Sequence, residues 1–132
     1  MATITNLDYN DGSINNNPVP PTPVDPNFTY PSEMLNTSTI TIINATPVLT
    51  TLLVDHFGDK TVALLDGTDI GQQKIINVCE SQTENINNKI IIQPSNFGAL
   101  TSMGLYSVSN SVMMVWDGSK WCIISGTGVI LD

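Results

Sequence analysis

Short apolar runs separated by turn residues form the main pattern of the chain from Thr39 onward. Turn residues recur about every 8–12 positions, a spacing typical of sandwiches and barrels. No long stretch keeps the 3.6-residue period of an amphipathic helix, and only the surroundings of Met34 and Leu35 allow one. The prediction is a compact all-β domain, an antiparallel sandwich or barrel of about eight short strands. Strands are expected at 39–43, 48–54, 61–65, 73–79, 89–93, 100–109, 112–116 and 121–124, before a short terminal run at 129–131.

The best-defined local prediction is a hairpin in the sequence VWDGSKW. Asp117-Gly118 between two apolar runs is typical of a type I′ turn, because Gly has no Cβ and Asp tolerates a positive φ. A turn centred on these two residues places Trp116 opposite Ser119 and Trp121 diagonally beside Trp116. The two indoles then form either a packed cross-strand pair, which is the favoured interpretation, or an exposed platform for stacking sugars.

Residues 1–38 differ in composition from the rest, because six of the eight prolines lie between Pro18 and Pro31. Proline fixes φ and lacks an N–H, so this segment is expected to be an extended arm ahead of a β-domain at 39–132. The arm is either a disordered leader or, as its large apolar residues favour, a strap that docks on another surface or subunit. The apolar anchors of such a strap are Ile4, Leu7, Tyr9, Phe28 and Tyr30.

Several predicted strands are apolar at consecutive positions, as at Ile75-Ile76, Ile90-Ile91-Ile92 and Ile123-Ile124. A half-exposed strand alternates between apolar and polar residues, so consecutive apolar residues indicate that both faces are covered. A domain of roughly 90 residues has too little volume to cover both faces of so many strands. The pattern favours an obligate homo-oligomer, and the alternative is one filled sandwich with some exposed isoleucine.

Charge limits the classes of partner. The net charge is −8, Arg is absent, and four lysines are spread along the chain. Nucleic acids and anionic membranes are bound through clustered cations, so neither is expected as a partner. The N-terminus lacks the basic and apolar regions of a signal peptide, and no apolar run has the ~20 residues of a membrane span.

The candidates for catalysis are few. His56 is the only histidine; it lies in a predicted turn near Asp55 and Asp59, and no GxSxG nucleophile motif is present. We expect His56 to be a solvated turn residue and the chain to have no catalytic residue and no enzymatic activity.

The candidates for metal binding are also weak. The loop from Asp66 to Gly71 resembles a calcium loop superficially, but it fails the EF-hand pattern, which leaves at most a looser ion site on Asp66 and Asp69. Cys79 and Cys122 lie in apolar runs and are expected to be buried free thiols, because no CxxC motif and no sign of an oxidising compartment are present. We therefore expect neither a metal site nor a cofactor.

Three segments carry a resemblance to a known group of proteins. They are a DGTxxGQ loop at 66–72, a strand ending in QPSNFG at 93–98, and the WDGxxW hairpin at 116–121. This order resembles small β-rich domains in structural proteins of tailed phages and large DNA viruses, often decoration (cement) proteins and fibres. The match covers about residues 61–126, half the chain, and consists mostly of turn and packing residues. The resemblance implies a structural role, commonly as a trimer on the outside of a virion, and no catalytic residues.

The sequence thus leads to two main hypotheses about function. The first is a virion structural protein, a capsid-decorating module that forms a homotrimer through its β-domain and straps to the major capsid protein by its arm. Its location would be the capsid surface, after assembly in the cytoplasm of the host cell. The alternative is a receptor- or carbohydrate-binding module of a fibre or spike, although fibres usually contain a long shaft or repeats, and none is present.

Overall fold

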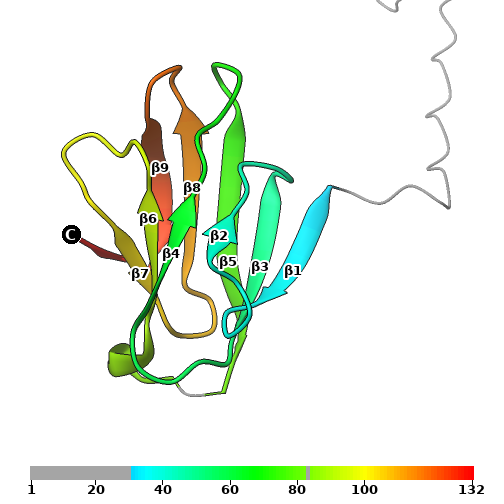
Figure 1. Cartoon of the computed structure of the whole chain (residues 1–132), viewed down its shortest axis with the longest axis vertical. Coiled ribbons are helices and arrows are strands. Elements are labelled where there is room, and N and C mark those ends of the chain that lie inside the picture. Colours follow the sequence, from blue (N-terminus) through cyan, green and yellow to red (C-terminus); the bar gives the residue numbers. More distant parts are fainter. Residues whose placement is uncertain (1–30, 83) are drawn as a thin grey trace, which may run out of the picture.

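Two five-stranded sheets pack face to face in the computed structural model, which describes residues 31–82 and 84–132 (Figure 1). The sheet order β1-β3-β5-β8-β9 defines the first sheet, whose strands are Ser32–Asn36, Leu49–Val54, Gln73–Ser81, Ser111–Trp116 and Trp121–Thr127. The second sheet has the order β10-β7-β6-β4-β2, with strands Ile130–Leu131, Met103–Leu105, Ile90–Pro94, Lys60–Leu64 and Ile42–Ile43. One short 3₁₀ helix, Ile86–Asn88, precedes β6. The predicted all-β sandwich is confirmed, and the sheets do not close into a barrel.

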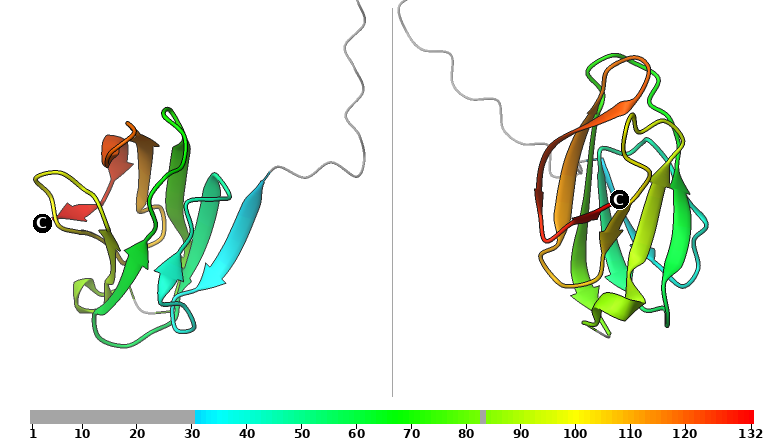
Figure 2. Two further views of the ribbon diagram at one scale, coloured as in Figure 1. Left: turned by 45° about the horizontal axis from the view of Figure 1, so that its top comes forward. Right: turned by 90° about the vertical axis from the view of Figure 1, so that its left-hand side faces the viewer.

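The path of the chain explains why the sheets are mixed rather than antiparallel. From β1 to β6, consecutive strands alternate between the two sheets, so each connection crosses from one layer to the other (Figure 2). Neighbours within a sheet are then two strands apart in the chain and run parallel, as in the β1-β3-β5 and β2-β4-β6 pairings. Antiparallel pairing begins with the consecutive strands β6 and β7, and it also joins β5 to β8 and β8 to β9.

The core lies between the sheets and is built from alternate residues of each strand. In β3 and β8 the alternation is strict, with every second side chain buried. Each fully buried aliphatic side chain contributes about 1.5–3 kcal/mol of transfer free energy. The aliphatic and methionine side chains with no measurable exposure are Ile43, Leu52, Val54, Leu64, Ile76, Ile90, Ile92, Met103, Leu105 and Met114.

The first strand lies within the range predicted as the arm. The possible helix around Met34 and Leu35 is wrong, because these residues belong to β1, an edge strand parallel to β3. Leu35 packs against the core while Met34 is 66% exposed, which is the alternation of a strand. β-structure therefore starts before Thr39. The predicted arm anchors Ile4, Leu7, Tyr9, Phe28 and Tyr30 lie outside the described residues, and their role stays a prediction.

The predicted hairpin is present as β8 and β9, but its turn differs from the expected one. Trp116 pairs directly with Trp121, so it is not opposite Ser119, and the two tryptophans are not diagonal neighbours. The loop spans four residues, closed by the Asp117 N–H donating to the Lys120 carbonyl over 3.1 Å. Gly118 has φ +103° but Asp117 has no positive φ, which excludes a type I′ turn centred on Asp-Gly. The Asp117 carboxylate accepts the N–H groups of Ser119 and Lys120 and thereby favours the wider loop.

The consecutive isoleucines divide between the interior and the outer faces. Ile76 and Ile90 are fully buried between the sheets, as is Ile92. Their neighbours Ile75 and Ile91 point to the outer faces and are half-buried, because successive side chains of a strand alternate. In β9, Ile123 packs on the core whereas Ile124 is 55% exposed. The single described chain thus leaves part of this apolar surface uncovered.

Candidate functional site

The three motifs of the viral resemblance come together at one end of the sandwich. The Trp121 N–H donates to the Asn96 carbonyl, and its indole Nε1 donates to the Leu65 carbonyl, both over 3.0 Å. Asn96 also donates from its side chain to Asp66 over 2.8 Å. Gly67 lies so close to Trp116 that a Cβ there would stand 2.5 Å from Cγ of the indole. This loop cluster is held by packing and backbone hydrogen bonds, which is what residues typical of turns provide.

The tryptophan pair belongs to the core and is not an exposed platform. Trp116 and Trp121 are 6% and 1% exposed, with ring centroids 5.4 Å apart and an edge-to-face angle of 64°. Such aromatic pairs contribute about 0.5–1.5 kcal/mol beyond their buried area. The favoured interpretation of a packed pair is confirmed, and a sugar could not stack on either ring in this arrangement.

The loop after β4 provides its own hydrogen-bond partners. Gln72 accepts at Oε1 from the backbone N–H of Thr68 over 2.7 Å, and the Thr68 hydroxyl donates to Asp69 over 3.0 Å. The Asp66 carboxylate accepts from Asn96, which belongs to another loop. The carboxylates of this loop thus serve to close it. Within residues 31–82 and 84–132, no group of three or more His, Cys, Asp and Glu side chains is arranged to hold a metal ion.

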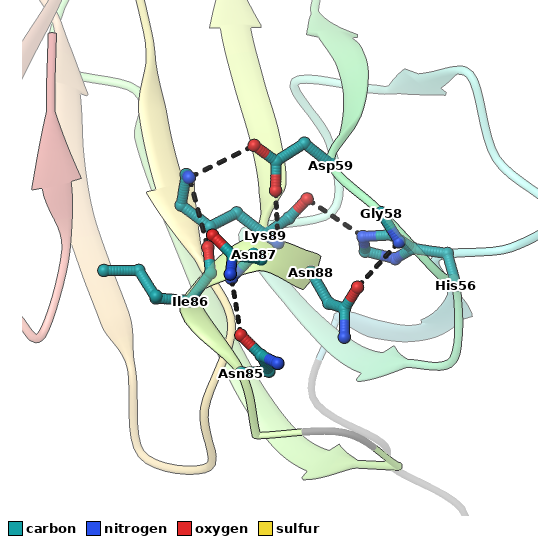
Figure 3. A network of polar contacts seen from close by, with 8 residues as sticks. All are labelled: His56, Gly58, Asp59, Asn85, Ile86, Asn87, Asn88 and Lys89. Atoms are coloured by element: carbon teal, nitrogen blue, oxygen red, sulfur yellow. Dashed lines mark hydrogen bonds and ion pairs between the residues drawn. The ribbon is translucent and has the colours of Figure 1, made fainter.

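His56 is 7% exposed, so the prediction of a solvated turn residue is wrong. Its Nδ1 lies 2.7 Å from Oγ1 of Thr37. Its Nε2 lies 2.9 Å from the Lys89 carbonyl (Figure 3). A carbonyl can only accept, so Nε2 carries a proton and donates it. Thr37 is fully buried and its hydroxyl also lies 3.3 Å from Asp55. A buried hydroxyl between His and Asp differs from a nucleophile triad, in which the Asp orients the His, and no substrate could reach it.

The end of the sandwich opposite the loop cluster contains a polar network that fixes the segment before β6 (Figure 1). Lys89 donates to Asp59 through both its backbone N–H, over 3.1 Å, and its Nζ, over 3.2 Å (Figure 3). These two hydrogen bonds lower the pKa of Asp59 below its ordinary value. Gly58 N–H donates to the side chain of Asn88. These contacts join two loops distant in sequence, so His56 and its neighbours have a structural role in the described part of the chain.

One buried residue, a lysine, was not identified from the sequence as a candidate for a special role. Lys74 is fully buried; its Nζ donates to the Pro47 carbonyl over 2.7 Å and to Thr50 Oγ1 over 2.6 Å. Glu33 lies 3.8 Å from Nζ, and it accepts a hydrogen bond from Thr50 over 2.7 Å. Burial lowers the pKa of Lys74 to about 8, and the Glu33 carboxylate opposes this shift. The signal in the sequence was a single lysine inside the apolar run QKIINVC.

A shallow polar basin of about 680 Å³ lies beside the loop cluster, on the outer side of the second sheet. The floor of the basin includes Ala63 and Leu100. Its polar lining offers amides, hydroxyls and one ammonium group, from Gln93, Ser95, Asn96, Thr101, Ser119 and Lys120. Lys120 is paired with Asp117 over 2.9 Å, so the basin has little net charge.

The outer face of the first sheet carries an uncharged apolar patch. Leu49, Ile75 and Met113 are paired across β3, β5 and β8 and form one row over the middle of the sheet. Val115 and Cys122 form the next row toward the loop cluster, and the exposed Ile124 lies beside them. We call these six residues the sheet-face patch.

The surroundings of the sheet-face patch are polar but almost free of charge. Thr51, Asn77 and Ser111 form the neighbouring row, where Thr51 donates to Asn77 over 3.0 Å. Among the outward positions of the five described strands, the charged residue is Glu80, beyond this polar row. An apolar centre with a neutral polar rim is the usual anatomy of a protein–protein interface.

The two cysteines are free, as predicted, but they are not both buried. Cys79 is exposed at an irregularity of β5, where Leu52 pairs with Val78 and Leu53 with Glu80. Cys122 is half-buried in the sheet-face patch, with its Sγ 3.5 Å from the Asp117 carboxylate.

Comparison of the sequence with protein-family models and with curated proteins finds no match. In the described part of the chain, no helix is long and apolar enough to cross a membrane. The resemblance to viral decoration domains therefore stays a prediction.

Proposed function

We propose that the chain is a structural protein of a virion, a capsid-decorating module. Its β-domain assembles into a homotrimer, and its N-terminal segment straps the module to the major capsid protein. The observation that carries the proposal is the sheet-face patch with its uncharged surroundings, centred on Ile75. In this patch Ile124 is exposed and the other five side chains are half-buried, and contiguous apolar surface on an outer face marks sites of protein interaction.

A decorating module must contact both its own copies and the lattice beneath it, and the sandwich has two outer faces for these contacts. The face of the second sheet also bears apolar side chains: Ile91 and Ile130 are half-buried there, and Ile42 is 48% exposed. β1 is an edge strand, so the segment that precedes Pro31 joins the domain at the rim of a sheet.

The alternative of a receptor- or carbohydrate-binding fibre or spike module retains one supporting observation, the polar basin beside the loop cluster. Its amides and hydroxyls could hydrogen-bond a sugar, as in sites where a few polar groups fix the orientation of a ligand. The basin presents no exposed tryptophan or tyrosine, since both tryptophans are in the core. We therefore rank this alternative second.

Particles from the source of the chain provide the test. The proposal predicts that mass spectrometry of purified virions finds the chain in stoichiometric proportion to the major capsid protein. After it is stripped from the particles, the full chain should rebind, and a chain that lacks residues 1–30 should not. Absence of the chain from virions, or equal rebinding of the truncated chain, would contradict the proposal.

A further inference from the structure

We infer that the sheet-face patch, formed by Leu49, Ile75, Met113, Val115, Cys122 and Ile124, is the surface through which the three copies of the homotrimer pack on one another around their threefold axis. This inference rests on the proposed function and names the partner of one of its two faces. The shape of the face, its charge and its contrast with the opposite face support it.

The shape of the face suits packing against other copies. Leu49, Ile75 and Met113 lie in register on three adjacent strands, with β5 at the centre of the sheet. Side chains on such a row stand perpendicular to the sheet, so the rows of three copies that face a common threefold axis can pack on one another. The position of the row, away from either edge strand, leaves polar residues around it to form the rim of an interface.

Charge favours this face as the place where acidic copies meet. Each copy has a net charge of −8, so two copies repel each other wherever their acidic surfaces meet. The face of the first sheet is where this cost is least, because its outward charged residue, Glu80, lies beyond the polar row. The Asp117 carboxylate at the border of the patch is neutralised by Lys120 at 2.9 Å.

The opposite face is less suited to this role. There Ile91 lies in a row with Thr61 and Gly104, and the side chain of Lys89 covers Gly104. Lys89 is also paired with Asp59 over 3.2 Å, so charged groups stand at the side of that apolar row. Burying this ion pair in an interface would require its desolvation, which the neutral face of the first sheet avoids.

Ile75 and Ile91 provide a matched pair of variants for the test. Both are half-buried, and both lie on the central strand of their sheet with the side chain on the outer face. Light scattering should find the wild-type full chain and Ile91→Lys as oligomers, and Ile75→Lys as a monomer of 14.2 kDa. Circular dichroism and thermal melting establish that each variant is folded.

A second measurement covers the case in which Ile75→Lys does not fold. Maleimide labelling with peptide mapping compares the thiol in the patch, Cys122, with the exposed thiol of Cys79. In the wild-type oligomer, Cys122 should react at least about tenfold more slowly than after dilution to monomers, because interface burial excludes the reagent. The reaction of Cys79 should change little.

Four results would overturn the inference. In light scattering, these are a monomeric wild-type chain, dissociation of the oligomer by Ile91→Lys but not by Ile75→Lys, and dissociation of the oligomer by both variants. In the labelling experiment, the contradicting result is equal reaction of Cys122 in oligomer and monomer. A monomer in which Cys122 is nevertheless protected, and becomes reactive after removal of residues 1–30, would assign the face to the arm instead. Each of these outcomes leaves virion binding untouched, since rebinding to particles tests that proposal separately.

Discussion

Lys74 lies in an environment very different from that of an ordinary lysine in water. Its ammonium is fully buried and has two short hydrogen bonds, yet the nearest carboxylate, Glu33, is 3.8 Å away. Burial penalises the charged form more than Glu33 favours it, so the pKa falls from 10.5 to about 8. The unfolded chain retains the higher pKa and therefore binds the proton more tightly than the folded chain.

This difference predicts how stability depends on pH. Below pH 8 the folded chain bears the full cost of a buried charge, and that cost is relieved as the pH rises from about 8 toward 10.5. Urea denaturation of wild type and Lys74→Met across this range measures the contribution, because the other titrating groups are common to both. The free energy of unfolding of wild type should rise relative to the variant by at least about 1 kcal/mol. Parallel pH profiles of the two proteins would contradict the assignment.

The hairpin of β8 and β9 illustrates how one side chain can set the geometry of an element. Asp117 accepts hydrogen bonds from Lys120 Nζ and from the backbone N–H groups of Ser119 and Lys120, and these hold its pKa far below the ordinary value. The four-residue loop places Trp116 directly opposite Trp121. The loop length thereby determines how the two indoles pack.

Substitutions at Asp117 separate the hydrogen bonds from the ion pair. Asp117→Asn keeps an oxygen for the two backbone N–H groups and loses only the charge pair with Lys120, which at the surface contributes little. Asp117→Ala loses both and should lower the melting temperature by a few degrees more than Asp117→Asn. Thermal denaturation at neutral pH checks this order. Equal melting temperatures would indicate that the turn does not depend on this acceptor.

A group of hydrogen bonds to one carboxylate joins the end of β1 to the end of β3. Asp55 accepts from the Ser38 N–H over 2.8 Å and from the Ser38 hydroxyl over 2.9 Å, with further hydrogen bonds from Thr37 and Asn36. Burial raises the pKa of Asp55, but these hydrogen bonds outweigh it and the net shift is downward. The carboxylate thus fixes the turn that follows the edge strand.

Loss of this carboxylate should loosen the edge strand. Asp55→Ala removes several acceptor contacts at once and should cost about 1–3 kcal/mol, with faster hydrogen exchange in Ser32–Asn36. Asp69→Ala is the matched control, because the Asp69 carboxylate accepts from the neighbouring Thr68 in an exposed loop. Hydrogen-exchange mass spectrometry compares the two. Unchanged exchange in β1 of Asp55→Ala would show that β3 alone holds the strand.

Among the strands, the sequence predicted their positions better than it predicted their pairing. The predicted strands at 73–79, 112–116 and 121–124 fall within observed strands. Consecutive β-branched and apolar residues favour the strand conformation, which explains this agreement. The parallel pairings were missed, since a turn of ordinary length does not reveal whether the next strand returns to the same sheet or crosses to the other. β1 was missed because SEMLN has no β-branched residue.

At the scale of the whole molecule, the sequence predicted the excess of apolar surface but could not place it. Consecutive isoleucines required one of each pair to face outward, and Ile75 does so beside Leu49 and Met113. The neighbours of Ile75 come from strands distant in the chain, so the patch depends on the topology that the sequence did not specify. The burial of His56 was missed for the same reason, because its partners Thr37 and Lys89 come from distant segments.

The mass of the purified full chain, measured by light scattering over a dilution series, tests most directly whether copies of this molecule cover one another. The account predicts a mass of about 43 kDa, three chains of 14.2 kDa, that persists when salt is raised, because salt screens the mutual repulsion of acidic copies and leaves apolar contacts intact. A mass of 14.2 kDa at every concentration would contradict it.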